Sequence, residues 1–276
     1  MNSKTIDLGK EYGLKGGTLD SICLDCPFDF PQEWKRPAVI VVPGGGYGMV
    51  SKREGETVAA AFLARGFQTF VLRYQTSEDG AAYPEQLIEL AAAFDYVRKN
   101  AESFSVNPDE VFAVGFSAGG HLVADLANEY MLVEEKYGKP LDCKPTAVGL
   151  SYPVIYPKGH MGSFDNLFKH SSKEERARLE PTLYLYERVT KDTSPAFIWS
   201  TFEDDVVSCE NALRYALAMK EAGVLFALQI YPFGAHGLST ADAEISPNYS
   251  KEGRRDAHGW VDACCEFFRI YVKESY

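Results

Sequence analysis

VFAVGFSAGG, from Val111 to Gly120, is the stretch that decides the fold of this chain. A continuous apolar run predicts a buried strand, and the Gly-Phe-Ser-Ala-Gly turn leads directly into a helix-like segment. A Gly-x-Ser-x-Gly turn between strand and helix holds its serine in a strained backbone at the top of the sheet. The positive end of the following helix then lies beneath the hydroxyl, where negative charge would develop. The pattern predicts that Ser117 is a nucleophile.

Two later loops carry the partners that such a nucleophile needs, an acid and then a histidine, each after a strand. The apolar run Ala196–Thr201 leads to Asp204 and Asp205. The apolar run Val224–Tyr231 leads to His236. The order along the chain predicts a catalytic triad made of the serine, this histidine and one of the two aspartates.

A glycine-rich loop upstream predicts the fourth part of the site. Pro37–Val42 reads as a strand, and PGGGYG at residues 43–48 follows it directly. Glycines allow such a loop to turn backbone N–H groups toward one point. Together with the N–H of Ala118, the N–H groups of Gly45 and Gly46 would form an oxyanion hole. The alternative is an ordinary tight turn between a strand and a helix.

These motifs resemble the esterase and lipase branch of the alpha/beta-hydrolases, in particular acetylxylan esterases and related carbohydrate deacetylases. The resemblance implies an α/β fold, a mostly parallel central sheet with helices on both faces and a small cap-like insertion. It also implies a serine ester hydrolase that acts on acetylated sugars or xylo-oligosaccharides and needs no metal or organic cofactor. The matching segments are VPGGGY at 42–47, SKREGE at 51–56, GFSAGGHL at 115–122, TFED at 201–204 and GAHGL at 234–238.

The acid of the triad is where the chain departs from the family pattern. Aligned through Ser208 and Asn211, the family's acid falls on Asp204. Relatives usually carry a Val-Pro pair after the acid, whereas this chain has Val207 followed by serine. We therefore expect Asp204 to be the acid and keep Asp205 as its competitor.

Composition limits the other function classes. A net charge of −11 over 276 residues, without a basic run, argues against nucleic acid as a partner. No stretch approaches the roughly 18 uninterrupted apolar residues of a membrane span. The N-terminal residues lack the apolar core of a signal peptide, which predicts a cytoplasmic protein. The expected partner is a small ester, and a homodimer is the commonest soluble assembly.

The rest of the chain predicts one domain over residues 1–276. Apolar strands and amphipathic helices alternate from residue 37, which is typical of a parallel sheet covered on both faces. An antiparallel strand pair is expected within Leu8–Asp29, at the sheet edge. Strands are expected to start near Ala38, Gln68, Val111, Ala147, Ala196 and Leu225, and helices to cover Glu54–Arg65, Pro84–Asn100, Ala118–Tyr130, Cys209–Ala222 and Asp256–Tyr271.

A segment at about 153–195 breaks this alternation and predicts two short helices in a cap-like insertion. Insertions of this kind lie above the carboxyl edge of the sheet, near the ligand crevice. We expect Tyr156 and Tyr184 in the insertion, and Tyr47 beside the glycines, to bind substrate. We expect Glu54 to favour the N-terminus of its helix. His160 and His170 also lie in the insertion, where either could touch substrate, although isolated loop histidines are usually neither ligands nor bases.

Two alternative functions remain, one that uses the same triad and one that does not need it. A formamidase or small-molecule amidase would use the same three side chains on an amide bond. A non-catalytic binding protein on a hydrolase scaffold would normally have lost the serine, the acid or the histidine, and none is missing here.

Overall fold

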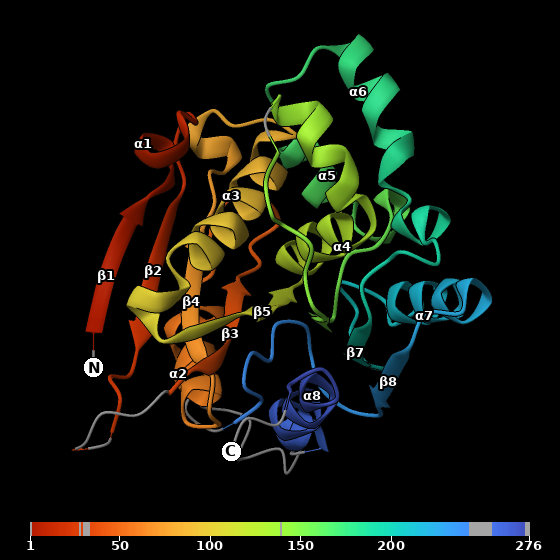
Figure 1. Cartoon of the computed structure of the whole chain (residues 1–276). Helices are drawn as coiled ribbons and strands as arrows, with labels where there is room; N and C mark the ends of the chain where they lie inside the picture. The colour runs from red at the N-terminus through yellow and green to blue at the C-terminus, as the bar shows by residue number, and fades with distance from the viewer. Residues whose placement is uncertain (1, 28, 30–33, 139, 243–255, 274–276) are drawn as a thin grey trace.

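The computed structural model describes residues 2–27, 29, 34–138, 140–242 and 256–273, and its strands form one eight-stranded sheet (Figure 1). The strand order is β1-β2-β4-β3-β5-β6-β7-β8. Neighbours from β4 to β8 run parallel, whereas β2 runs antiparallel to both β1 and β4. The prediction of a mostly parallel sheet is confirmed. The strands are β1 (Asn2–Asp7), β2 (Thr18–Cys23), β3 (Arg36–Val42), β4 (Gln68–Arg73), β5 (Val106–Phe116), β6 (Val148–Ser151), β7 (Ala196–Thr201) and β8 (Phe226–Tyr231).

Helices cover both faces of this sheet. The α-helices are α1 (Leu8–Tyr12), α2 (Glu56–Leu63), α3 (Glu85–Lys99), α4 (Ala118–Tyr137), α5 (Met161–Leu167), α6 (Lys173–Leu179), α7 (Glu210–Ala222) and α8 (Trp260–Arg269). Short 3₁₀ helices are η1 (Lys52–Glu54), η2 (Ser77–Asp79), η3 (Ala101–Phe104), η4 (Pro157–Gly159), η5 (Glu180–Leu183), η6 (Leu185–Arg188) and η7 (Asp256–Gly259).

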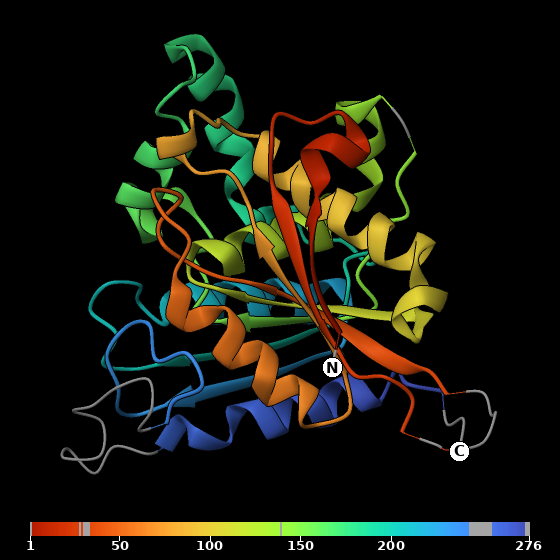
Figure 2. The same cartoon turned by 90° about the vertical axis from the view of Figure 1, so that its left-hand side faces the viewer.

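The alternation of side chains along β3 shows how the two layers are filled. Ile40 and Val42 join a core with residues of α3, α4 and α7, whereas Val39 and Val41 join a second core with residues of α2 and α8. Figure 2 shows α2 and α8 on one side of the sheet and α3 and α4 on the other. Successive side chains of a strand point to opposite faces, so a strand covered on both faces must be apolar throughout.

The N-terminal edge differs in detail from the expectation. β1 and β2 do form an antiparallel pair at the sheet edge, with Asp7 opposite Thr18. The first strand, however, lies before Leu8, and the residues that follow it form α1. The Asp7 side chain accepts the N–H of Lys10 and so caps this helix, and Gly13 ends it in a left-handed conformation. The expected strand within Leu8–Asp29 was therefore wrong for its first part.

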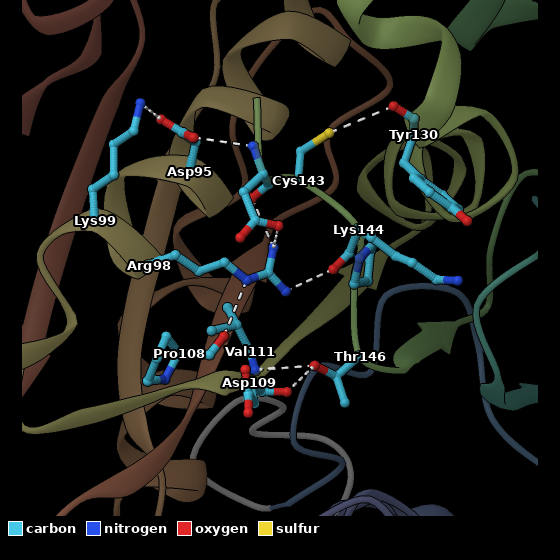
Figure 3. Close-up of polar contacts among 12 residues, drawn as sticks. Asp95, Arg98, Lys99, Pro108, Asp109, Val111, Tyr130, Cys143, Lys144 and Thr146 are labelled. Carbon is cyan, nitrogen blue, oxygen red and sulfur yellow. Dashed lines mark hydrogen bonds and ion pairs between the residues drawn. The ribbon is translucent and has the colours of Figure 1, made fainter. Parts of the chain in front are cut away.

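Arg98, in the last turn of α3, holds the residues that precede β6 against β5 (Figure 3). Its half-buried guanidinium donates hydrogen bonds to the carbonyl oxygens of Pro108, Asp142 and Lys144, at 3.1, 2.7 and 2.7 Å. One turn earlier, Asp95 accepts the N–H of Asp142 at 3.0 Å. Because Pro108 belongs to β5, these contacts support the strand whose far end carries the Gly-x-Ser-x-Gly turn.

The segment between β6 and β7 contains α5 and α6, which lie above α4 in Figure 1, and Phe164 and Leu167 of α5 belong to the same core as residues of α4. Two short helices are what the sequence predicts there. The reading of residues 1–276 as one domain with a cap-like insertion at about 153–195 stays a prediction. Among the helices of the described ranges, none combines the length and the apolar character needed to cross a membrane.

Candidate active site

Ser117 occupies the sharp turn between β5 and α4. Its backbone has φ 52° and ψ −116°, a conformation that residues other than glycine rarely adopt. The turn is possible because Gly119 brings the helix close to the neighbouring strand, where a Cβ atom would lie 2.2 Å from the carbonyl oxygen of Val42. The local sequence therefore places the Ser117 hydroxyl above the carboxyl edge of the sheet.

His236 links Ser117 to a carboxylate. Its Nε2 atom lies 2.9 Å from Ser117 Oγ, and its Nδ1 atom lies 2.7 Å from Asp204 Oδ2. The other oxygen of this carboxylate accepts the N–H groups of Val206 and Val207, at 3.0 and 2.8 Å. These groups come from the ends of β5, β7 and β8, which are parallel and meet at one edge. An acceptor at Nδ1 fixes the tautomer in which Nε2 is free to accept the serine proton.

The two aspartates that compete for the acid position have different surroundings. Asp204 is buried and contacts the imidazole, whereas Asp205 is exposed to solvent. A one-residue difference in this loop turns the side chain from the site to the surface. The geometry favours Asp204.

The glycine-rich loop lies beside the serine. Gly45 and Gly46 line the same cavity as Ser117 and have φ angles of 122° and 60°. A Cβ atom at Gly45 would lie 2.1 Å from the carbonyl oxygen of Met49, so this position requires glycine. Asn166 of α5 donates from Nδ2 to the carbonyl oxygen of Gly46 at 2.8 Å and so orients the loop from the insertion.

A third N–H group comes from Ala118, the first residue of α4, whose positive end faces the serine. In the part of the chain that the structure describes, no acceptor takes the N–H of Gly45, Gly46 or Ala118. Three N–H groups near the serine therefore have no acceptor within the described protein, as the predicted oxyanion hole requires.

The cavity at the serine has a volume of about 660 Å³. It is large enough for a small ester, since ligand pockets commonly measure roughly 300–1,000 Å³. Its walls come from the glycine loop, η1, the loop after β7 and the start of the insertion. The lining residues are Gly45, Gly46, Met49, Val50, Ser51, Lys52, Arg53, Glu54, Ser117, His160, Val206 and His236.

Two family models match this chain. The BD-FAE model matches residues 24–142, and the model of the prolyl oligopeptidase family matches residues 85–264. The second match covers well over half of the chain and includes the serine, the aspartate and the histidine described above. The chain belongs to the prolyl oligopeptidase family. The resemblance to the alpha/beta-hydrolases predicted from the motifs is confirmed.

Several proteins to which this chain is similar have names that refer to xylan or xylosides. The chain is 35% identical to endo-1,4-beta-xylanase B of Butyrivibrio fibrisolvens over 78% of its own length and 34% of the relative's. It is 30% identical to an acetylxylan esterase of Xylanibacter ruminicola over 75% of its length and 42% of the relative's. It thus spans less than half of these two curated proteins. The acetyl ester-xyloside bifunctional hydrolase of Caldicellulosiruptor lactoaceticus superimposes with a TM-score of 0.80 and 28% identity, over 98% and 97% of the two chains.

Glu54 is a part of this prolyl oligopeptidase-family site that the sequence did not reveal. Its buried carboxylate accepts the N–H of Gly44 at 2.9 Å and the hydroxyl of Tyr152 at 2.7 Å. Tyr152 in turn accepts the N–H of Ser239 at 2.9 Å, and its ring packs 5.0 Å from that of His236. One carboxylate therefore connects the glycine loop with the histidine loop. The expected role at the N-terminus of a helix was wrong, because α2 begins only at Glu56.

Glu54→Gln should lower kcat/KM for p-nitrophenyl acetate by about 10- to 100-fold, because small displacements of positioned groups are costly in catalysis. The two donors contact different oxygens of the carboxylate, and the amide keeps the size but replaces one of these oxygens with N–H₂, so one of the two hydrogen bonds loses its acceptor. Glu89→Gln is the matched control, since Glu89 is also buried and accepts a backbone N–H, from Gln75 at 2.8 Å. Equal kcat/KM values in the two variants, with equal melting temperatures, would contradict the role of Glu54.

The three tyrosines expected to bind substrate do not line the cavity. Tyr47 is buried, and its hydroxyl lies 2.7 Å from Nδ1 of His121, whose pKa burial lowers to about 3. Tyr156 and Tyr184 pack against each other, with ring centroids 6.2 Å apart, and the guanidinium of Arg214 lies over Tyr156. Substrate binding by these three tyrosines stays a prediction, and the residue that the insertion contributes to the lining of this cavity is His160.

Proposed function

We propose that this protein is a serine ester hydrolase that removes acetyl groups from acetylated sugars or xylo-oligosaccharides. The observation that carries the proposal is the chain of two hydrogen bonds from Ser117 Oγ through His236 to Asp204, at 2.9 and 2.7 Å, beside three free N–H groups. A serine, a base and an orienting acid in this arrangement activate a hydroxyl for acyl transfer.

The mechanism follows from these roles. His236 Nε2 takes the proton of Ser117 while Oγ forms a bond to the carbonyl carbon of the ester. The carbonyl oxygen becomes negative and is held by the N–H groups of Gly45, Gly46 and Ala118. The protonated imidazole then gives its proton to the leaving alcohol as the ester bond breaks. Water repeats the two steps and releases acetate, which restores the serine.

The names of the relatives support the choice of substrate. An acetylxylan esterase and an acetyl ester-xyloside hydrolase are among the proteins to which this chain is similar. Each catalytic step in the proposal uses side chains and backbone groups of the chain itself. A cytoplasmic location and a homodimer stay predictions.

A panel of esters and amides tests the proposal. The panel contains p-nitrophenyl acetate, butyrate and octanoate, methyl 2-O-acetyl-β-D-xylopyranoside, an N-formyl aromatic amide and p-nitroacetanilide. We expect the acetyl esters to give the highest kcat/KM and the acetylated xyloside to release acetate. A preference for the octanoate, or no acetate from the xyloside, would reject the sugar deacetylase; faster turnover of the amides would favour an amidase.

A further inference from the structure

His160 connects the insertion to the cavity. It lies between η4 and α5, is half-buried and belongs to the cavity lining together with Ser117 and His236. The same short helix carries Asn166, which holds the carbonyl of Gly46. The start of α5 is therefore next to the reacting groups rather than on the outer surface of the insertion.

The hydrogen bonds of His160 fix its tautomer. Its Nδ1 atom accepts the backbone N–H of Ser163 at 3.2 Å and lies 2.8 Å from Ser163 Oγ. An Nδ1 atom that accepts a backbone N–H carries no proton, so in the neutral ring the proton is on Nε2. Ser163 is buried, which makes this arrangement a fixed part of the N-terminus of α5.

The surroundings of His160 keep the ring neutral. Burial lowers its pKa, and the nearby imidazole of His236 lowers it further. A neutral imidazole with Nδ1 already occupied presents one free polar group, the Nε2–H. In the part of the chain that the structure describes, no acceptor takes this N–H.

The chemistry of an acetyl ester limits what this donor can meet. The acetyl group offers one acceptor, the carbonyl oxygen, and that oxygen goes to the N–H groups of the glycine loop and Ala118. Its methyl group offers none. Within a bound acetyl ester, the acceptor left for the Nε2–H therefore belongs to the alcohol part, which leaves on the side of His236.

We propose that His160 is a specificity-determining residue, whose Nε2–H donates a hydrogen bond to a hydroxyl or ring oxygen of the sugar that carries the acetyl group. This inference rests on the proposed sugar deacetylase function. The donor distinguishes a polyhydroxylated alcohol from an apolar one of the same size, since an apolar alcohol would remove water from the donor without accepting its hydrogen bond.

Two substitutions separate the donor from the helix cap. In His160→Asn, the side-chain oxygen can still accept the N–H of Ser163, but no group reaches the position of Nε2. In His160→Gln, the side-chain N–H₂ reaches the position of Nε2, but the cap is lost. His170→Asn is the control, because His170 is also in the insertion and its Nε2 contacts the carbonyl of Ser77 at 2.7 Å.

The experiment measures kcat and KM for methyl 2-O-acetyl-β-D-xylopyranoside and for cyclohexyl acetate, an ester of similar size without hydroxyl groups. We expect His160→Asn to lower the ratio of the two kcat/KM values by about tenfold, mainly through a higher KM for the xyloside. We expect the ratio for His160→Gln to stay within about twofold of the wild-type ratio. If unfolding or loosening of the insertion caused the loss in His160→Asn, the ratio for His160→Gln would fall as well.

The outcomes separate this inference from the function on which it rests. A wild-type enzyme that cleaves neither ester contradicts the proposed function. A wild-type enzyme that deacetylates the xyloside, with an unchanged ratio in His160→Asn, contradicts the role of His160 alone. Equal losses in the Asn, Gln and His170→Asn variants would assign the effect to packing of the insertion and overturn the inference.

Discussion

Ser117→Ala should lower kcat for p-nitrophenyl acetate by about 10⁶, because the members of a triad act as a unit and no other group can form the acyl-enzyme. The methyl group of alanine fits the space of the serine without its hydroxyl. The turn keeps its glycine neighbours, so the fold should be preserved. Steady-state kinetics at substrate saturation measure the effect.

Labelling supplies an independent check on the same residue. A fluorophosphonate probe forms a covalent bond with an activated serine, so the wild-type chain should be labelled and the alanine variant should not. Circular dichroism and melting temperature show whether the variant is folded. Retention of most of the activity in a folded Ser117→Ala variant would remove this serine from the mechanism.

Asp204→Asn should lower kcat by about 10⁴, the cost expected when the orienting carboxylate of a triad becomes an amide. The amide N–H₂ would donate to Nδ1 of His236, which leaves the proton on Nε2. That nitrogen then cannot accept the proton of Ser117. The wild-type contact that this change inverts is the 2.7 Å hydrogen bond between Asp204 Oδ2 and Nδ1.

Asp205→Asn is the matched control, one residue further along the same loop. Asp205 is exposed and should change kcat less than about twofold, in line with the small effects of most surface substitutions. The two variants have the same chemistry and the same effect on net charge. A larger loss in Asp205→Asn than in Asp204→Asn would transfer the role of the acid to Asp205.

Local patterns predicted the elements that carry the site. The apolar runs before Ser117, Asp204 and His236 are β5, β7 and β8 in the structure. A strand buried on both faces leaves a clear signal because every side chain in it must be apolar. Strand starts were less accurate: β5 begins at Val106, before the expected Val111, since its first residues are partly polar and exposed.

Contacts between distant residues were outside the reach of these patterns. Glu54 looked like a helix-terminal acid, yet its partners Gly44 and Tyr152 are 10 and 98 positions away. An aromatic side chain suits a pocket wall and core packing equally well, so the sequence alone does not separate these two roles for the tyrosines of the insertion. Burial and hydrogen-bond partners decide between such roles, and neither can be predicted from a single segment of sequence.

The hydrogen bond from Asn166 to the carbonyl of Gly46 has a consequence for attempts to change what this enzyme acts on. Grafting a foreign segment in place of residues 153–195 would exchange more than the groups that recognise the alcohol. It would also release the peptide unit that follows Gly46 from its anchor on α5. Selectivity and turnover thus both depend on one short helix. A chimera that lacks Asn166 should have a lower kcat even for the simplest ester.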